Sequence, residues 1–122
     1  MQCKNNVNRG VFLENTGCGL CNRKCRVDRD NGEKGFCGET SEIRCGRAAL
    51  HMWEEPCISG TRGSGTVFFT GCVLKCVFCQ NSVLAESKVG KPVTVPRLAE
   101  IFLELQNKGA HNINPVSYTH LT

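Results

Sequence analysis

The chain has 122 residues, enough for one ordinary domain, and 10 of them are cysteine. The formal net charge is only +4, from 15 basic and 11 acidic residues that are scattered along the chain, so nucleic-acid binding has little support. No apolar run approaches the ~20 residues that a bilayer-spanning helix needs, which argues against an integral membrane protein.

The high cysteine content has two interpretations. Short cysteine-rich chains are disulfide scaffolds when they are secreted and metal-binding proteins when they are cytosolic. Residues 1–6 (MQCKNN) contain no apolar core of a secretory signal. We therefore expect a cytoplasmic protein whose thiolates bind metals, with disulfides as the weaker alternative.

Residues 18–45 form a cysteine module, which comes after a polar segment with one isolated cysteine, Cys3, that receives no role. The module has the spacing C-x2-C-x3-C, and a fourth cysteine lies 12 positions later, after an Asn-Gly turn. Four thiolates suffice for a closed zinc site or an auxiliary iron–sulfur cluster, and the spacing does not separate these two. Packing as small apolar side chains is a third interpretation. The N-terminal cysteines are Cys18, Cys21, Cys25 and Cys37, with Cys45 as a spare candidate ligand.

Residues 46–60 are predicted to be a docking segment between the cysteine module and the C-terminal half of the chain, because a proline and apolar residues surround Trp53. Glu54 and Glu55 are paired carboxylates of the kind that perform acid–base chemistry, and His51 is a potential ligand. No partner for these three side chains is identifiable in the sequence. We therefore favour structural roles for all three.

Residues 66–81 carry the strongest signal in the chain. A glycine-rich turn precedes residues 66–70 (TVFFT), whose β-branched and aromatic side chains on both faces predict a buried parallel strand. Three cysteines come directly after it, at spacing C-x3-C-x2-C. A 4Fe–4S cluster commonly takes four cysteines, so a loop with three leaves one iron free for another ligand. Active sites of α/β folds lie at the carboxyl ends of strands, so this position predicts a catalytic metal centre. The loop cysteines are Cys72, Cys76 and Cys79.

The remainder of the chain predicts one more helix and one more strand. Residues 82–93 are expected to form a loop, and residues 95–108 a helix with Thr94 as N-cap, an apolar face at helical spacing and Gly109 as its stop. Residues 112–116 are expected to form the second strand. Strand, helix and strand together make one βαβ unit, which we expect to be right-handed.

Several longer stretches support a family assignment. Phe78 directly precedes the last loop cysteine, and the loop lies within a run from GSGTVFFTGC (residues 63–72) to CQN (residues 79–81). Two further segments are HMWEEPCISG (residues 51–60) and GAHNIN (residues 109–114). Together they resemble the radical S-adenosylmethionine superfamily and, within it, proteins related to pyruvate formate-lyase-activating enzyme. The resemblance spans residues 18–114.

The resemblance implies an α/β fold: the start of a partial (β/α) radical-SAM barrel over residues 61–122, preceded by a cysteine-rich, loop-rich N-terminal module over residues 1–60. It implies a [4Fe–4S] cluster on the loop cysteines and S-adenosylmethionine on the open iron. It also implies that Phe78 lies beside the cofactor, although ordinary core packing is an equal alternative for an aromatic side chain.

The implied activity is an oxidoreductase reaction: reductive cleavage of S-adenosylmethionine to a 5′-deoxyadenosyl radical that abstracts hydrogen, with no catalytic side chain beyond the cluster ligands. Flavodoxin or ferredoxin would donate the electron, and a glycine in a protein substrate would be activated. Neither nucleic acid nor a membrane is an expected partner. The alternative from another class is a non-catalytic zinc or iron–sulfur module with a structural or electron-transfer role.

The end of the chain departs from the family pattern. Relatives continue the second strand with an apolar residue and a polar end, whereas this chain continues with Pro115, and proline in a central strand removes a hydrogen-bond donor. Residues 117–122 resemble adapter-derived sequence and receive no function. Since one βαβ unit cannot bury its own faces, we expect this sequence to be a fragment of a longer enzyme.

Overall fold

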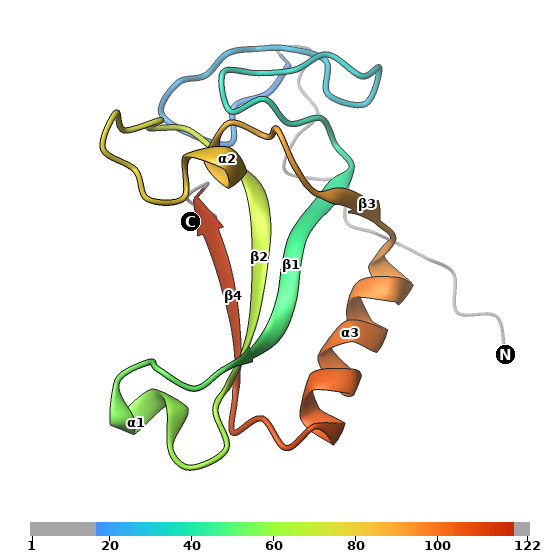
Figure 1. Cartoon of the computed structure of the whole chain (residues 1–122). Helices are drawn as coiled ribbons and strands as arrows, with labels where there is room; N and C mark the ends of the chain where they lie inside the picture. Colours follow the sequence, from blue (N-terminus) through green and yellow to red (C-terminus); the bar gives the residue numbers. More distant parts are fainter. Residues whose placement is uncertain (1–16, 119–122) are drawn as a thin grey trace, which may run out of the picture.

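The computed structural model describes residues 17–118, so Cys3 lies outside the described residues. Residues 17–42 form loops and turns, in agreement with the expected loop-rich start, and every helix and strand comes after them. In chain order the elements are β1 (Ile43–His51), α1 (Pro56–Ser59), β2 (Ser64–Cys72), α2 (Ser82–Ala85), β3 (Lys91–Val93), α3 (Val95–Asn107) and β4 (Ile113–Tyr118) (Figure 1).

The four strands form one mixed sheet in the order β3-β1-β2-β4. Strand β2 is antiparallel to β1 and parallel to β4, and α3 lies between β2 and β4 in the chain. The predicted strand, helix and second strand are therefore confirmed, and so is their parallel arrangement. Figure 1 shows β2 and β4 side by side with both carboxyl ends at the same end of the sheet. The handedness of the unit and a complete barrel stay predictions.

Two predictions of local structure are wrong. Residues 82–93 were expected to form a loop but contain α2 and the short strand β3, which pairs with β1. Residues 43–51 were divided between the cysteine module and a docking segment, but they form β1, an inner strand of the sheet. The register of β1 shifts between Cys45 and Arg47, and a Cβ on Gly46 between them would lie 2.3 Å from Leu84 Cδ2. A bulge with a glycine therefore lets α2 pack closely on β1.

The sheet pairs strands from both sides of residue 60, where we placed the boundary between the two segments, and that boundary stays a prediction. Trp53 is 89% exposed, and the stretch that connects β1 to α1 lies at the opposite end of the sheet from the N-terminal loops (Figure 1). Residues 52–55 therefore do not dock the cysteine module, contrary to the expectation for this segment.

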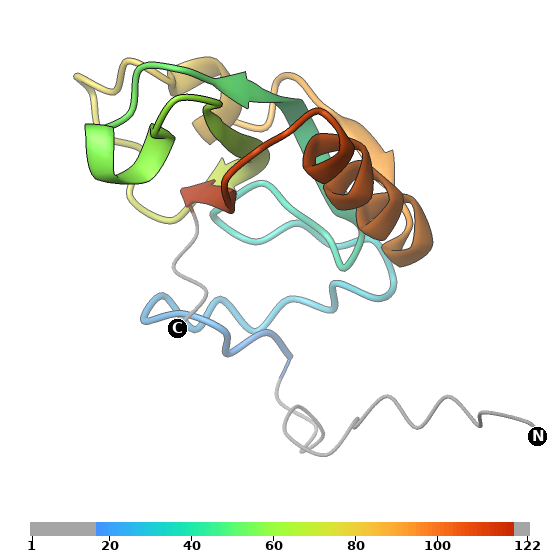
Figure 2. The ribbon, with the colours of Figure 1, turned by 90° about the horizontal axis from the view of Figure 1, so that it is seen from below.

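Helix α3 matches its predicted signals. The Thr94 side chain accepts a hydrogen bond from the Arg97 backbone N–H at 3.3 Å, which is the N-cap that the sequence predicts. Gly109 has φ +91°, as expected for a residue that ends a helix. Leu105 is buried against β2, where a Cβ on Gly65 would lie 3.2 Å from the Leu105 Cβ. Helix and sheet thus approach closely at a glycine, and Figure 2 shows α3 alongside the strands.

Strand β4 has no partner on its outer side among residues 17–118, so it is an edge strand of the described sheet. Pro115 lies opposite Val67 on this edge strand, and edge strands are where sheets accommodate proline. Within the same part of the chain, none of the helices has the length and apolar character required to cross a lipid bilayer.

Candidate metal centre

The cluster loop, residues 71–81, starts where β2 ends, as the sequence predicts. Cys72 is the last residue of β2 and is buried, whereas Cys79 is half-buried and Cys76 is exposed. The backbone N–H of Leu74 lies 3.4 Å from Cys72 Sγ, and the Cys79 N–H donates to the Cys76 carbonyl at 3.1 Å. The first loop cysteine is therefore fixed by the sheet, and the other two share one exposed turn.

The donor set of this loop fits an iron–sulfur cluster. All three loop cysteines are free thiols, and thiolates are the ligands that such clusters take. The Leu74 N–H faces the Cys72 sulfur, and hydrogen bonds to sulfur are one of the features that tune cluster potentials. Within residues 17–118, no three His, Cys, Asp or Glu side chains are grouped closely enough to hold a metal ion. The fit therefore rests on the donor chemistry and on the shared loop.

One cation from the N-terminal loops, Arg23, and one from the cluster loop itself, Lys75, lie at the start of the cluster loop. Arg23 Nε donates to the Val73 carbonyl at 2.8 Å, and the Arg23 guanidinium lies 3.6 Å from the centre of the Phe36 ring. Lys75 Nζ lies 4.8 Å from the same ring. These contacts attach the cysteine module to the loop and place positive charge beside thiols that become negative when they bind metal. Nothing in the local sequence distinguishes Phe36 as the common partner of Arg23 and Lys75.

A buried acidic side chain lies under the same loop. Glu39 is 7% exposed, and its Oε1 accepts hydrogen bonds from Thr70 Oγ1 at 2.7 Å and from Ser87 Oγ at 2.5 Å. Sequence reasoning gave Glu39 no role, because an isolated glutamate beside Gly38 and Thr40 resembles a surface turn. Its position close to the loop becomes evident only from the fold.

The structure brings some of the N-terminal cysteines together. A Cβ on Gly35 would lie 2.8 Å from Cys25 Sγ and 3.8 Å from Cys37 Sγ, so these two sulfurs flank the same glycine. Cys37 is buried, and Arg29 Nη2 donates to its sulfur at 3.1 Å. All four N-terminal cysteines line a cavity of about 1260 Å³, which the N-terminal loops share with one face of the sheet. All four therefore border one space, although within residues 17–118 no three of them are close enough together to hold a metal ion.

Local hydrogen bonds favour the thiolate form of Cys25. Desolvation by burial acts to raise its pKa, but hydrogen bonds from the backbone of Val27 and Phe36 and from the Cys18 side chain act in the opposite direction, and the pKa is lowered. A thiol with a lowered pKa deprotonates more readily, and a metal requires the deprotonated form.

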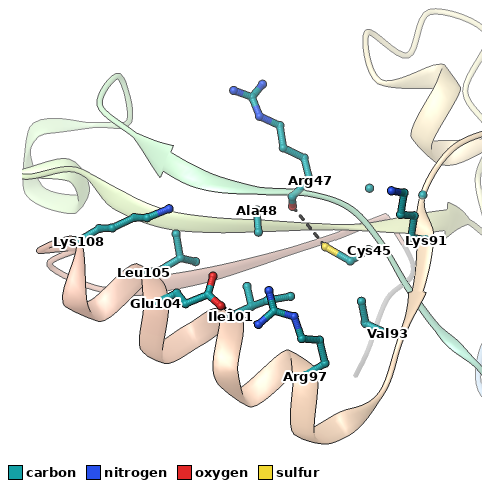
Figure 3. Close-up of a pocket in the computed structure, with 12 residues that line it drawn as sticks. Cys45, Arg47, Ala48, Lys91, Val93, Arg97, Ile101, Glu104, Leu105 and Lys108 are labelled. Carbon is teal, nitrogen blue, oxygen red and sulfur yellow. Dashed lines mark hydrogen bonds and ion pairs between the residues drawn. The ribbon is translucent and has the colours of Figure 1, made fainter.

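The remaining residues that the sequence analysis considered lie outside both groups of cysteines or point into solvent. Cys45, the spare ligand, lines a different cavity of about 420 Å³ between β1, β3 and α3, and its thiol points to the Arg47 carbonyl at 3.5 Å (Figure 3). Burial raises the pKa of the Cys45 thiol. Phe78 is 86% exposed, so the alternative of core packing does not apply within the described structure. His51 Nε2 and Glu54 Oε1 are 3.9 Å apart at the carboxyl end of β1, which lies away from the cluster loop.

Known proteins support the metal centre. Residues 59–115, just under half of the chain, match the family model of a 4Fe-4S single cluster domain, and this range contains the three loop cysteines. Over 64 residues the chain is 42% identical to the uncharacterized protein MJ0674 of Methanocaldococcus jannaschii. The matched stretch is 52% of this chain and 18% of that protein. The chain thus spans less than a fifth of that curated relative. No solved structure gives a significant match. The family match indicates a 4Fe–4S cluster-binding domain around the cluster loop.

Proposed function

We propose that Cys72, Cys76 and Cys79 hold one [4Fe–4S] cluster with an open iron, and that the protein is a radical S-adenosylmethionine enzyme. The observation that supports this most is the position of the cluster loop at the carboxyl end of β2, an inner strand that is parallel to β4. A structural zinc module requires no such order of elements. A ferredoxin-like carrier would normally close its cluster with a fourth cysteine, whereas the cluster loop, residues 71–81, offers three.

The residues of this chain would bind the cluster and fix its orientation. Cys72 supplies a ligand held rigidly by β2, while Cys76 and Cys79 supply two ligands from a turn that can adjust to a metal centre. With S-adenosylmethionine, a reduced cluster supplies one electron that breaks a sulfonium carbon–sulfur bond and gives methionine and a 5′-deoxyadenosyl radical. Arg23 and Lys75 would offset part of the negative charge of the thiolates.

The exposed side chains of the cluster loop are the candidates for contact with the cofactor. Leu74, Val77 and Phe78 are exposed although all three are apolar. We assign Phe78 to the cofactor side, since an aromatic ring next to the last cysteine can cover a planar base. An electron donor such as flavodoxin or ferredoxin, and a protein substrate whose glycine loses hydrogen, complete the proposal.

We further propose that Cys18, Cys21, Cys25 and Cys37 hold a second metal, zinc or an iron–sulfur cluster. Three observations support this: the shared cavity, the two sulfurs beside Gly35 and the lowered pKa of Cys25. Either metal accepts four thiolates, so the donor set does not choose between them.

Product formation tests the enzymatic proposal. The natural protein that contains this sequence is reconstituted with iron and sulfide, reduced by a strong one-electron donor and given S-adenosylmethionine. We expect 5′-deoxyadenosine and methionine from the parent and from a Cys57→Ala control, whose cysteine lies on α1 outside the loop, but not from Cys76→Ala. Equal product from the parent and Cys76→Ala, or none from a fully clustered parent, would favour the non-catalytic module instead.

A further inference from the structure

Glu39 is buried without a cationic partner. Within the described residues it forms no ion pair, and its Oε1 is instead held by the hydroxyls of Thr70 and Ser87 at 2.7 and 2.5 Å. Burying a carboxylate is unfavourable unless it is hydrogen-bonded, so a purely structural need for packing would be met better by an apolar side chain. Its location suggests a more specific purpose.

The partners of Glu39 lie on the two sides of the cluster loop. Thr70 is near the end of β2, two residues before Cys72, and Ser87 comes after α2, beyond Cys79. Ser87 Oγ also lies 3.2 Å from the Cys37 carbonyl oxygen, so its one hydroxyl hydrogen is shared between that oxygen and Glu39 Oε1. One carboxylate oxygen therefore connects the segment that enters the loop with the segment that leaves it, and both with the cysteine module.

The backbone is shaped to fit this carboxylate. Gly71 adopts φ +85°, and a Cβ there would lie 2.4 Å from Glu39 Cγ and 3.0 Å from Oε1. The side chain of Glu39 thus lies directly against the peptide that precedes the first loop cysteine. Gly38 also has a positive φ, +85°, and a Cβ on it would lie 2.9 Å from Ser87 Oγ. Two glycines therefore permit the close approach of the three segments.

We infer that Glu39 is a positioning residue for the loop cysteines. Its carboxylate oxygen fixes the distance between the segment that enters the cluster loop and the segment that leaves it. This distance sets the orientation in which the three thiols bind a cluster. This inference rests on the proposed cluster on Cys72, Cys76 and Cys79. Glu39 contacts neither the thiols nor a cofactor, and it acts through Thr70, Gly71 and Ser87.

Four single variants separate this role from simple packing. In Glu39→Gln the amide oxygen can still accept both hydroxyl hydrogen bonds at nearly the same size, whereas Glu39→Asp is one methylene too short to reach both donors. Glu39→Ala removes both hydrogen bonds. Glu42→Gln is the matched control, because Glu42 is an exposed glutamate of the same segment.

The measurement is the rate at which an iron chelator removes the loop cluster from the anaerobic, reconstituted natural protein that contains this sequence, which is also the parent of the product assay. Each variant is compared with its own Cys76→Ala counterpart, so that only absorbance dependent on the loop is counted. Glu39→Ala and Glu39→Asp should lose the cluster about tenfold faster than the parent, as expected when buried hydrogen bonds are lost. Glu39→Gln and Glu42→Gln should stay within about twofold of the parent.

A substitution of Thr70, which donates a hydrogen bond to Glu39, keeps the inference testable if Glu39→Ala misfolds. Thr70→Val keeps the shape of the side chain but removes its hydroxyl, so it should accelerate cluster loss, and the pair Glu39→Ala with Thr70→Val should lose the cluster no faster than Glu39→Ala alone. Additive effects, or equal rates in Glu39→Ala and the parent, would overturn the inference. So would a Glu39→Gln variant as fast as Glu39→Ala.

The outcomes also distinguish this inference from the proposed function. A parent that holds its cluster but yields no 5′-deoxyadenosine would contradict the enzymatic proposal, while the comparison of chelation rates would still support a positioning role. Equal chelation rates in a parent that does form product would overturn the role of Glu39 alone. A parent without any Cys76-dependent cluster would overturn both.

Discussion

Replacing Gly71 by alanine should destabilise the attachment of the cluster loop to β2. At φ +85° an alanine costs about 1–2 kcal/mol, because its Cβ crowds the following carbonyl. The same Cβ would lie 2.4 Å from Glu39 Cγ, and this side chain is buried and held by two hydroxyls, so overpacking adds about 1–3 kcal/mol. Together these terms predict a loss of about 2–5 kcal/mol in the free energy of unfolding.

Two other glycines provide matched controls. Gly32 has φ +84° with nothing within 4 Å of the added Cβ, so Gly32→Ala carries the backbone strain without the clash. Gly19 likewise has open space around the added Cβ and no positive φ, so Gly19→Ala should change little. The difference between Gly71→Ala and Gly32→Ala therefore isolates the contact with Glu39.

The assay is the urea midpoint of the anaerobic, metal-loaded chain, followed by far-ultraviolet circular dichroism and by cluster absorbance. With a urea dependence of about 1–3 kcal/mol per molar, a clash of about 2 kcal/mol lowers the midpoint by about 1 M relative to Gly32→Ala. Equal midpoints for Gly71→Ala and Gly32→Ala would refute the close packing of Glu39 against the loop.

The remaining predictions concern the thiols and the stability of the chain. Alanine at any one loop cysteine should abolish the absorbance and the paramagnetic signal of the oxygen-sensitive cluster, whereas Cys57→Ala should retain both; full iron at this site in all three loop variants would contradict the assignment. A variant that lacks all three loop cysteines should still contain zinc or iron at the N-terminal cysteines, and finding neither metal would favour packed, metal-free thiols. The apo chain should lack a sharp, reversible melt, because neither edge of its sheet is paired within residues 17–118 and metal binding supplies folding free energy. In the apo chain, burial raises the Cys45 pKa above its ordinary value of 9.0, so a smaller fraction of Cys45 is thiolate at any given pH. The rate of Cys45 alkylation, measured by peptide mass spectrometry, should therefore still increase above pH 9.0. A rate that levels off below that pH would contradict the burial.

Elements with strong local signals could be predicted from the sequence. Strand β2 is predicted by the β-branched and aromatic run TVFFT, and α3 by its Thr94 cap, its apolar spacing and Gly109. Strand β1 has no such signal, since it contains two arginines and a glycine, and its strand conformation depends on pairing with β2 on one side and β3 on the other. Strand β3 has only three residues, one of them proline, which is too short for any periodic pattern.

The candidate site also contains residues that the local sequence predicts and residues that only the fold brings together. Spacing alone predicts the loop cysteines as candidate ligands, because residues on one short loop are close in sequence as well as in space. The residues that support the loop are distant in sequence: Arg23 contacts Val73 across 50 positions, and Glu39 contacts Thr70 across 31. No local pattern identifies such pairs, so the supporting residues became evident only once the sheet had placed the three segments together.

In the proposed loop cluster, one iron of the four is not held by a cysteine of this loop. Mössbauer spectroscopy of the natural protein, reconstituted with ⁵⁷Fe in a background that lacks the N-terminal cysteines, tests this directly. We predict that one iron of the four changes its spectrum when S-adenosylmethionine is added, and that the other three do not. Four irons that all remain unchanged, with the cofactor at saturating concentration, would contradict the open iron and with it the proposed enzyme.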